Sequence, residues 1–294
     1  MSNLKEIRSR ISSVTTIRQV TSAMKMVSAA KLKKAQDGII QIRPYADKMN
    51  SIIGTIASEL DRAANSPFTI QNDPNKVLVV VIASNRGQCG AFNSNVIKRA
   101  SELAEGRYAS QLRKGKVHFL SIGKQGEKRL KTKGYKVIET AHHTLEKLNY
   151  ESSSALANHL MDFFLTGKYD RIELVYNQFK NAAVQVLIAE QFLPVKQDMK
   201  KEEKSHEKYN FFFEPSEDEI IKILIPRSLK IQFFKALLDS NASEQGARMT
   251  AMHQATDNAT DLLRELRLNY NKARQATITN EILEIVSGAE ALKG

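Results

Sequence analysis

Apolar and small side chains recur at alternating spacings of four and three residues along the proline-free stretch from Ala242 to Gly288. This alternation is typical of a coiled-coil seam, and it predicts one helix about 65 Å long at a rise of roughly 1.5 Å per residue. Half of the seam positions carry small or polar residues where a stable zipper carries leucine or isoleucine, so we expect only weak association with a partner helix. The seam positions are Gln245, Met249, Met252, Thr256, Ala259, Leu263, Leu266, Tyr270, Ala273 and Thr277.

The N-terminal residues follow a similar pattern, which restarts twice. It predicts a helix from about Asn3 to about Leu60, with a kink at Pro44 and local overwinding at each restart. Such a helix is the natural partner of the C-terminal one, and the two are expected to pack antiparallel if the middle of the chain forms a compact unit at one end. The three groups of seam positions are Leu4, Ile7, Ile11 and Val14; Ile17, Val20, Met24 and Val27; and Leu32, Ala35, Ile39 and Ile42.

Between the two ends the pattern changes to that of a sheet. The continuous β-branched run Val77–Ala83 is typical of a strand buried on both faces of a parallel sheet. Strands and helices then alternate, which predicts a Rossmann-like α/β domain. Further strands are expected at 117–122, 135–140, 171–176 and 183–193, with a hairpin through 177–181, and helices at about 93–111, 125–133 and 152–164.

These elements predict one domain made from both ends of the chain and a second domain inserted between them. The first is an antiparallel coiled-coil shaft of residues 1–60 and 215–294, and the second is an α/β globular domain of residues 75–214. Ser216 and Glu219 form a capping box that starts the final helix, which Pro226 is expected to break or kink. The charged stretch Asp198–Asn210 is expected to be a flexible insert.

Positive charge is concentrated at the N-terminal end. The chain has a net charge of +12, and residues 1–50 hold ten Lys and Arg against three acidic residues, a net +7. Residues 243–294 hold six against seven, a net −1. A basic arm beside a nearly neutral helix favours an acidic partner for the arm. Asp257, Asp261 and Glu265 form an acidic row on the outer face of the C-terminal helix, which either is simply solvated or meets cationic groups of a partner.

Targeting and redox signals are weak. The single cysteine, Cys89, cannot form an internal disulfide, which fits a reducing compartment. No run of about eighteen apolar residues predicts a membrane-spanning helix. The basic N-terminus is not expected to be a mitochondrial presequence, because Glu6 interrupts it and the helical pattern continues past any plausible cleavage point.

No motif predicts a catalytic, cofactor-binding or metal-binding site. Gly87 and Gly90 follow the first strand, but their spacing matches no dinucleotide or Walker motif, so a tight turn is expected there. Gly123 and Gly126 also fail the Walker pattern. The pair His142 and His143 has no second ligand cluster at metal spacing, and we expect a solvated loop.

Several segments resemble the gamma-subunit family of bacterial F-type ATP synthases, and they cover both ends and the middle of the chain in order. The N-terminal matches are Leu4–Ile11 (LKEIRSRI) and Ile17–Leu32 (IRQVTSAMKMVSAAKL), and the loop Arg86–Asn93 (RGQCGAFN) resembles the family's first loop. The C-terminal matches are Ser243–Met252 (SEQGARMTAM), Ala255–Ala259 (ATDNA) and Tyr270–Gly288 (YNKARQATITNEILEIVSG).

The resemblance implies a rotor that catalyses nothing by itself. In this family the coiled coil lies inside a ring of alpha and beta subunits, and the α/β domain lies against the epsilon subunit and the membrane c-ring. Proton flow turns the ring and the shaft, and the asymmetric shaft drives the beta sites through ATP synthesis. The implied location is peripheral, on the cytoplasmic face of the bacterial inner membrane, with no cofactor and no membrane-spanning segment.

The resemblance also implies contact residues between the rotor and the surrounding subunits. Met24 and Lys25 match positions where the N-terminal helix meets an acidic loop of the beta subunit, and Arg248 falls in the matching C-terminal motif. The upper contacts implied are Arg274, Gln275, Thr279, Glu281 and Glu284, and the apolar tip that turns in the bearing is Ile278, Ile285 and Val286. A weak seam suits a shaft that must turn in its sleeve.

Two other classes of protein compete with this interpretation. A basic coiled-coil nucleic-acid-binding protein would use the +7 arm, but the neutral C-terminal helix and the lack of aromatic platforms in the arm argue against it. An enzyme on the α/β domain would need a phosphate loop or paired acidic residues at the strand ends, and the sequence has neither.

Overall fold

Two long helices dominate the structure, a computed structural model that describes residues 4–59, 67–69, 71, 73–146, 148–195 and 217–291. Helix α1 spans Leu4–Glu59 and helix α6 spans Glu217–Ala291. The predicted N-terminal helix is thus confirmed. Neither proline ends its helix, since Pro44 lies inside α1 and Pro226 lies inside α6. Of the break or kink predicted at Pro226, the break is therefore excluded. The Ser216 cap and the 198–210 insert lie outside the described residues.

A five-stranded sheet forms the middle of the chain, in the order β3-β2-β1-β4-β5. Strands β1 to β4 are parallel, and β5 runs antiparallel to β4. The strands are β1 Val77–Ile82, β2 Val117–Ile122, β3 Val137–Thr140, β4 Arg171–Phe179 and β5 Gln185–Leu193. The helices between them are α2 Phe92–Glu105, α3 Ala109–Arg113, α4 Lys124–Thr132, the 3₁₀ turn His143–Leu145 and α5 Tyr150–Leu165.

Two element boundaries differ from the prediction. The helix expected to reach Gln111 ends at Glu105, because Gly106 caps it and α3 begins only at Ala109. The hairpin turn lies beyond Phe179 and not at 177–181, since Asn177 still pairs with Leu187 across the two strands. The other predicted strands and helices are found within a few residues of their expected bounds.

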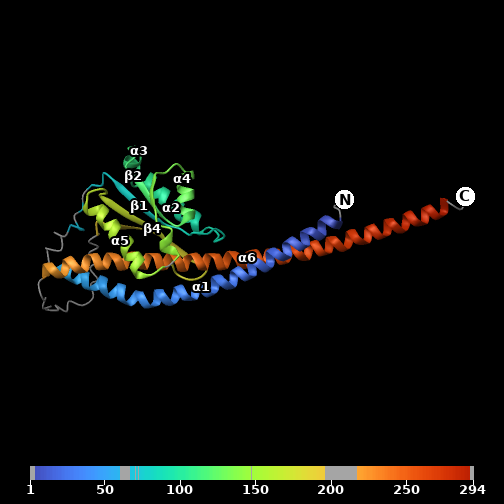
Figure 1. Cartoon of the computed structure of the whole chain (residues 1–294), viewed down its shortest axis with the longest axis horizontal. Coiled ribbons are helices and arrows are strands. Elements are labelled where there is room, and N and C mark those ends of the chain that lie inside the picture. Colours follow the sequence, from blue (N-terminus) through green and yellow to red (C-terminus); the bar gives the residue numbers. More distant parts are fainter. Residues whose placement is uncertain are drawn as a thin grey trace. The chain divides into compact units, whose positions relative to one another are not determined.

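Both faces of the sheet are covered, as the β-branched sequence of β1 predicts. All six residues of β1 are buried. Leu78, Val80 and Ile82 face a core shared with α5 and with α6 around Phe233. Val77, Val79 and Val81 face the opposite core, shared with α2 and α4. In Figure 1 the sheet accordingly has α2 and α4 on one side and α6 on the other.

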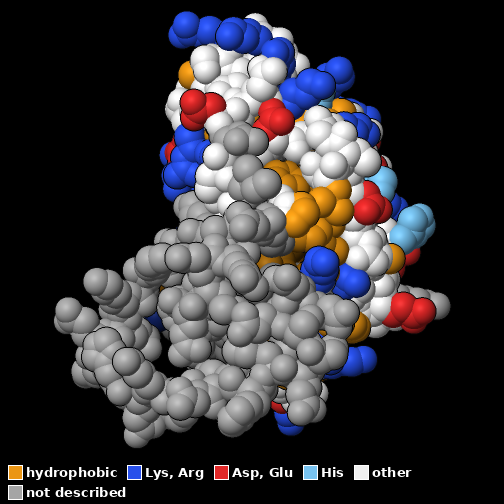
Figure 2. Space-filling model, turned by 90° about the vertical axis from the view of Figure 1, so that its left-hand side faces the viewer, with side chains coloured by type: hydrophobic (Ala, Val, Ile, Leu, Met, Phe, Trp, Pro, Cys, Tyr) orange, Lys and Arg blue, Asp and Glu red, His pale blue; other side chains and the backbone are white. Residues whose placement is uncertain are grey.

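The chain divides into two compact units, and each long helix contributes to both. Unit 1 consists of residues 1–28 and 248–294, and unit 2 consists of residues 29–247. Within unit 2, α1 and α6 pack antiparallel, since Ala46 and Met49 contact Ile231 while Gly38 lies close to Leu238. The end view in Figure 2 shows lysine and arginine side chains spread over the described surface, with acidic side chains between them.

The predicted seam of α6 is confirmed. Every seam position from Gln245 to Thr277 is buried or half-buried, and the acidic row Asp257, Asp261 and Glu265 is exposed on the outer side. The buried apolar members in unit 1 are Met252, Ala259 and Leu263. Small and polar residues therefore do form the seam.

The predicted restarts in α1 are wrong. Ile17, Val20 and Val27 are 52%, 50% and 56% exposed, so they do not belong to the seam. The buried and half-buried positions follow an unbroken alternation of four and three residues instead, with polar side chains in the middle of unit 1. These positions are Ile7, Ile11, Val14, Arg18, Thr21, Lys25 and Ser28 in unit 1, and Leu32, Ala35, Ile39 and Ile42 in unit 2.

Candidate interaction surface

Few specific contacts hold the two helices of unit 1 together. The Arg8 guanidinium donates a hydrogen bond of 2.8 Å to the Tyr270 hydroxyl, which lowers the pKa of that phenol. Further along, the Thr256 hydroxyl donates to the Thr21 hydroxyl at 2.9 Å. These pairs place the N-terminal end of α1 beside the later part of α6, so the helices of unit 1 pack antiparallel, as predicted.

Unit 1 exposes apolar side chains on both helices. On α1, Ile17, Val20 and Val27 form an exposed stripe at spacings that keep them on one side of the helix, next to the exposed Met26. On α6 the exposed large apolar residues of unit 1 are Leu262, Leu268, Ile278, Ile282, Leu283, Ile285 and Val286. Exposed large apolar side chains on both helices of one unit make this unit the candidate interaction surface.

The predicted contact residues of the lower shaft are less accessible than those of the tip. Met24 and Lys25 are half-buried, and Lys25 occupies a seam position of α1. Arg248 is only 8% exposed, so little of its side chain is accessible to another chain in this structure.

The predicted contact residues of the upper shaft are all exposed. From Ile278 to Glu290 every side chain of α6 is exposed, which means that no described residue of the chain covers this end of the helix. The predicted contact residues of the upper shaft are Arg274, Gln275, Ile278, Thr279, Glu281, Glu284, Ile285 and Val286. The structure leaves all of them free for contact with another chain.

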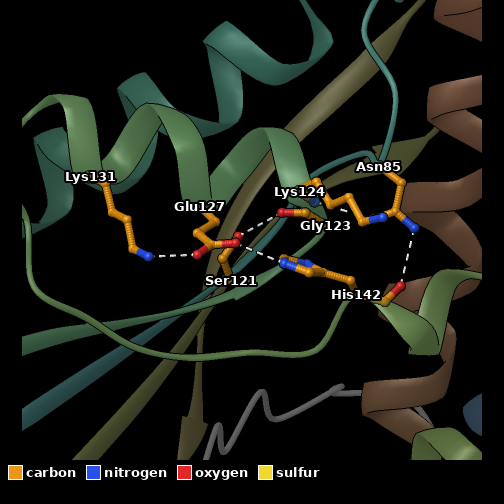
Figure 3. A network of polar contacts seen from close by, with 7 residues as sticks. All are labelled: Asn85, Ser121, Gly123, Lys124, Glu127, Lys131 and His142. Atoms are coloured by element: carbon orange, nitrogen blue, oxygen red, sulfur yellow. Dashed lines mark hydrogen bonds and ion pairs between the residues drawn. The ribbon is translucent and has the colours of Figure 1, made fainter.

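The carboxyl ends of β1 and β2, where α/β folds bind nucleotides, are occupied by the chain's own polar contacts (Figure 3). The Asn85 side chain accepts from the Lys124 backbone N–H at 3.1 Å and donates to the His142 carbonyl at 3.1 Å. Glu127 accepts from Lys131 at 2.7 Å and contacts His142 Nε2 at 2.8 Å. Lys131 and His142 thus hold the Glu127 carboxylate in place. Both lower the pKa of Glu127, and the hydrogen bond from Lys131 is the main cause.

The amino end of α4 offers few donors to a phosphate. The backbone N–H groups of Lys124, Gln125 and Glu127 donate to Asn85 Oδ1, to the Ser84 carbonyl and to the Gly123 carbonyl. Gly123 has a φ of 109°, and a Cβ there would lie 2.3 Å from the Ala83 carbonyl oxygen. This glycine therefore serves the close approach of loop and strand. The prediction that these glycines mark no Walker loop fits this packing.

The predicted solvated pair of histidines is half wrong. The His143 side chain is 96% exposed, but that of His142 is 18% exposed and contacts Glu127. The sequence could not separate these neighbours, because the partner Glu127 lies fifteen positions away on another element. Among the described residues no group of His, Cys, Asp and Glu is arranged to hold a metal ion. Within the same residues, no helix is long and apolar enough to span a bilayer.

The turn after β1 is filled by side chains. Cys89 is buried, and Asn93 donates to its sulfur at 3.1 Å while its Oδ1 accepts from the Ser84 backbone N–H at 3.0 Å. Gln88 and Gly90 adopt left-handed backbone conformations that close the turn. This agrees with the predicted tight turn.

A second polar cluster in unit 2 joins both long helices to the sheet. Arg43 of α1 lies 3.6 Å from Asp239 of α6 and donates to the Phe179 carbonyl at 3.3 Å. Asp239 is fully buried, and burial raises its pKa despite the nearby Arg43 and Lys235. Burial likewise raises the pKa of Glu190, which accepts from Gln232 and Tyr176. No local sequence pattern indicates this cluster, because its members are far apart in the chain.

Paired long helices with uncovered apolar side chains define this chain as a subunit of a larger assembly. The ATP synthase family model matches residues 3–292. The ATP synthase gamma chains of Flavobacterium psychrophilum and Cytophaga hutchinsonii are 53% and 48% identical to it; the first covers 100% of both chains and the second 99% of both. The chain therefore belongs to the ATP synthase gamma chain family, and it is a subunit of an ATP synthase complex.

Solved structures agree with this family. A chain of the Tetrahymena thermophila mitochondrial ATP synthase central stalk and c-ring is 25% identical, with a TM-score of 0.60 over 80% of this chain and 99% of that one. A chain of the Euglena gracilis mitochondrial ATP synthase rotor has a TM-score of 0.64 at 21% identity, over 94% of this chain and 98% of that one. These likenesses confirm the predicted fold class and give no support to a nucleic-acid-binding coiled coil.

Proposed function

We propose that this chain is the central rotating shaft of a proton-translocating ATP synthase, and that unit 1 turns inside a ring of alpha and beta subunits. The observation that carries the proposal is the uncovered surface of unit 1, where apolar side chains remain exposed on both helices and none of residues 278–290 is covered. Family membership supplies the identity of the assembly.

The weak seam supports rotation inside a sleeve. A shaft must be held by its surroundings without adhering strongly at one angle, and apolar side chains distributed over both helices can provide such a surface. In the tip, Ile278, Ile285 and Val286 are exposed apolar residues, while Arg274 and Glu281 are exposed charges. We assign the apolar residues to the bearing, and the charged and polar residues to contacts with the beta subunits.

Unit 2 is the proposed attachment of the shaft to the rest of the rotor. Its sheet packs against α6, and the exposed Arg43 of α1 reaches both the buried Asp239 of α6 and the Phe179 carbonyl of β4. Torque applied to the α/β region would therefore pass directly into α1 and α6. We propose that the epsilon subunit and the c-ring bind this region, and that the complex lies on the cytoplasmic face of the bacterial inner membrane without the chain itself crossing it.

Reconstitution tests the proposal. The purified chain is mixed with alpha and beta subunits of the same source, and assembly is followed by size-exclusion chromatography together with ATPase activity. We expect a stable complex whose activity needs this chain. Deletion of residues 278–294 should reduce activity, because it removes the part of α6 that no described residue covers.

A second variant separates contact from folding. Replacement of Gln275 and Thr279 by alanine changes two exposed side chains, so the chain should fold as before and the activity of the complex should fall. A chain that does not assemble, but hydrolyses nucleotide or binds duplex DNA by itself, would contradict the proposal.

A further inference from the structure

The four parallel strands of unit 2 all begin next to a lysine. Lys76, Lys116 and Lys136 directly precede β1, β2 and β3, and Lys168 lies three positions before β4. Because these strands are parallel neighbours in the order β3-β2-β1-β4, their amino ends share one edge of the sheet. We call this edge, with its four lysines, the lysine edge.

Three of the four lysines are placed by the same kind of turn. A glycine with a left-handed backbone follows each of the helices α3, α4 and α5, at φ values of 68°, 81° and 69°. An added Cβ would meet nothing within 4 Å at any of these positions, so the backbone conformation is what requires glycine. The lysine follows one or two positions later, where the chain enters the strand. The glycines are Gly115, Gly134 and Gly167.

The charges of the lysine edge act together on His118 of β2. Its imidazole is half-buried, and Nδ1 lies 2.8 Å from the hydroxyl of the buried Tyr169. Burial lowers the pKa of this imidazole, and the positive charges of Lys136, Lys168 and Lys76 lower it further. Lysines from three separate segments therefore lie close enough to be felt at one side chain.

The ammonium groups of the lysine edge form no ion pair with a carboxylate in the part of the chain that the structure describes. Lys116 Nζ donates to Asn75 Oδ1 at 2.6 Å. Lys168 Nζ lies 3.9 Å from the centre of the Phe163 ring. Both partners are neutral, so both charges are kept, and the other two lysines are exposed to solvent.

The carboxylates beside the edge are engaged by other groups. One oxygen of Asp170 accepts from the backbone N–H groups of Asn75 and Lys76, at 2.9 and 2.8 Å. Glu139 of β3 contacts His159 Nε2 at 3.0 Å. The lysine edge therefore presents net positive charge to its surroundings.

We propose that the lysine edge binds the anionic phosphate headgroups of a lipid membrane. Its lysines come from four separate segments, so they offer a spread of flexible point charges and no single cradle of fixed donors, which favours a surface of many headgroups over one bound anion. Leu165, at the end of α5 and three positions before Lys168, is 50% exposed and adds an apolar side chain that can enter between headgroups. The inference rests on the proposed function, which puts unit 2 on the membrane side of the complex.

Lysine footprinting tests this surface in the full-length chain. The chain is mixed with vesicles of equal parts phosphatidylglycerol and phosphatidylcholine, exposed amines are briefly acetylated, and mass spectrometry measures the modification of each lysine. We expect Lys76, Lys136 and Lys168 to react several-fold more slowly than without vesicles, whereas Lys124 and Lys128, exposed on α4, keep their rates. Equal protection of both sets, no protection of the first set, or the same protection by inorganic phosphate alone would overturn the inference.

A charge-matched pair of variants measures the contribution of the edge. Replacing Lys76, Lys136 and Lys168 together by glutamine should weaken binding to the same vesicles about a hundredfold at low salt, and less as salt is added. The control replaces three exposed lysines on α2 and α4 of the same unit, and it should weaken binding much less. The control variant is Lys98→Gln with Lys124→Gln and Lys128→Gln. Equal losses in the two triple variants would overturn the inference.

Failure of this inference and failure of the proposed function are distinguishable. Both triple variants should assemble with alpha and beta subunits and keep ATPase activity, because the replaced lysines lie outside unit 1. Failure of the unmodified chain to assemble would refute the proposed function. Protection of the edge lysines in a complete complex purified free of lipid would mean that a protein subunit covers them, and would overturn the inference alone.

Discussion

The same two helices are held very differently in the two units. In unit 2, α6 packs on a sheet, and Phe233, Ala236 and Leu237 are completely or almost completely buried in a core with strands on the other side. In unit 1 the helices have mainly each other, and the buried apolar side chains are few: Ile7, Met252, Ala259 and Leu263. The unit 2 part of α6 is anchored on the sheet, whereas in unit 1 both helices keep apolar side chains that no described residue covers.

The largest expected effect comes from the core of unit 2. Phe233→Ala should lower the free energy of unfolding of unit 2 by about 3–5 kcal/mol, because the cavity left beside Phe192, between α6 and the sheet, cannot collapse. Leu263→Ala in unit 1 should cost only about 2 kcal/mol, since solvent and exposed neighbours can fill the gap. Urea unfolding followed by segment-resolved hydrogen exchange measures both. The contrast between the units would be contradicted if both variants lost the same free energy of unfolding, or if Leu263→Ala accelerated hydrogen exchange in unit 2.

The second largest expected effect concerns how the stability of unit 2 depends on pH. Asp239 has a raised pKa in the fold, so its contribution to stability is fully present below its unfolded pKa, near 4, and is lost as pH rises through the folded value. Asp239→Asn should therefore reduce the fall in stability from about pH 4 towards neutral pH and should stabilise unit 2 at neutral pH. Urea unfolding at a series of pH values tests this.

A matched variant on the surface serves as the control for this pH series. Asp37 lies exposed on α1 in the same unit, and Asp37→Asn should leave the pH dependence as it is. If Asp239→Asn leaves the slope unchanged as well, or makes the unit less stable at neutral pH, then the buried carboxylate stabilises the helix contact instead of straining it.

The smallest expected effect concerns the polar seam of unit 1. Thr256→Val alone leaves the Thr21 hydroxyl without its donor and should cost about 1 kcal/mol. Valine at both positions removes donor and acceptor together and fills the same space, so the double variant should lie within about 0.5 kcal/mol of the original chain. Hydrogen exchange of residues 252–263 is the measurement. Additive losses in the double variant would mean that the two hydroxyls act independently.

Periodicity predicted the helices because their seams, although weak, are regular. The seam of α6 was found in full, and the buried strand β1 was evident from its unbroken β-branched run. In α1 the same method chose the wrong face, since Ile17, Val20 and Val27 are the most apolar residues of that stretch while the seam holds Arg18, Thr21 and Lys25. Hydrophobicity identifies a face that needs covering, and it does not say which chain covers it. Continuing the register from Ile7 through Ile39 without interruption would have found the true seam.

The candidate contact residues could be predicted from the sequence only through the family resemblance. The exposure of Gln275, Thr279 and the apolar tip is consistent with that expectation, and the contacts themselves remain predictions. The groove that Arg18, Arg264 and Arg267 line between α1 and α6 could not be found in this way, and neither could the Asp239 cluster, because each depends on which side chains of distant segments meet. Arg18 and Arg267 become neighbours only when the helices pair in one register.

Observation of single complexes tests the rotor directly. Complexes are fixed to a surface through the alpha or beta subunits, and a bead is attached to His143→Cys, a position whose side chain is 96% exposed on unit 2. Cys89 is buried, so the introduced thiol is the accessible one of this chain's two cysteines. We expect the bead to turn continuously in one direction when ATP is added and to stop when ATP is removed. Complexes that hydrolyse ATP while the bead stays fixed would contradict the account.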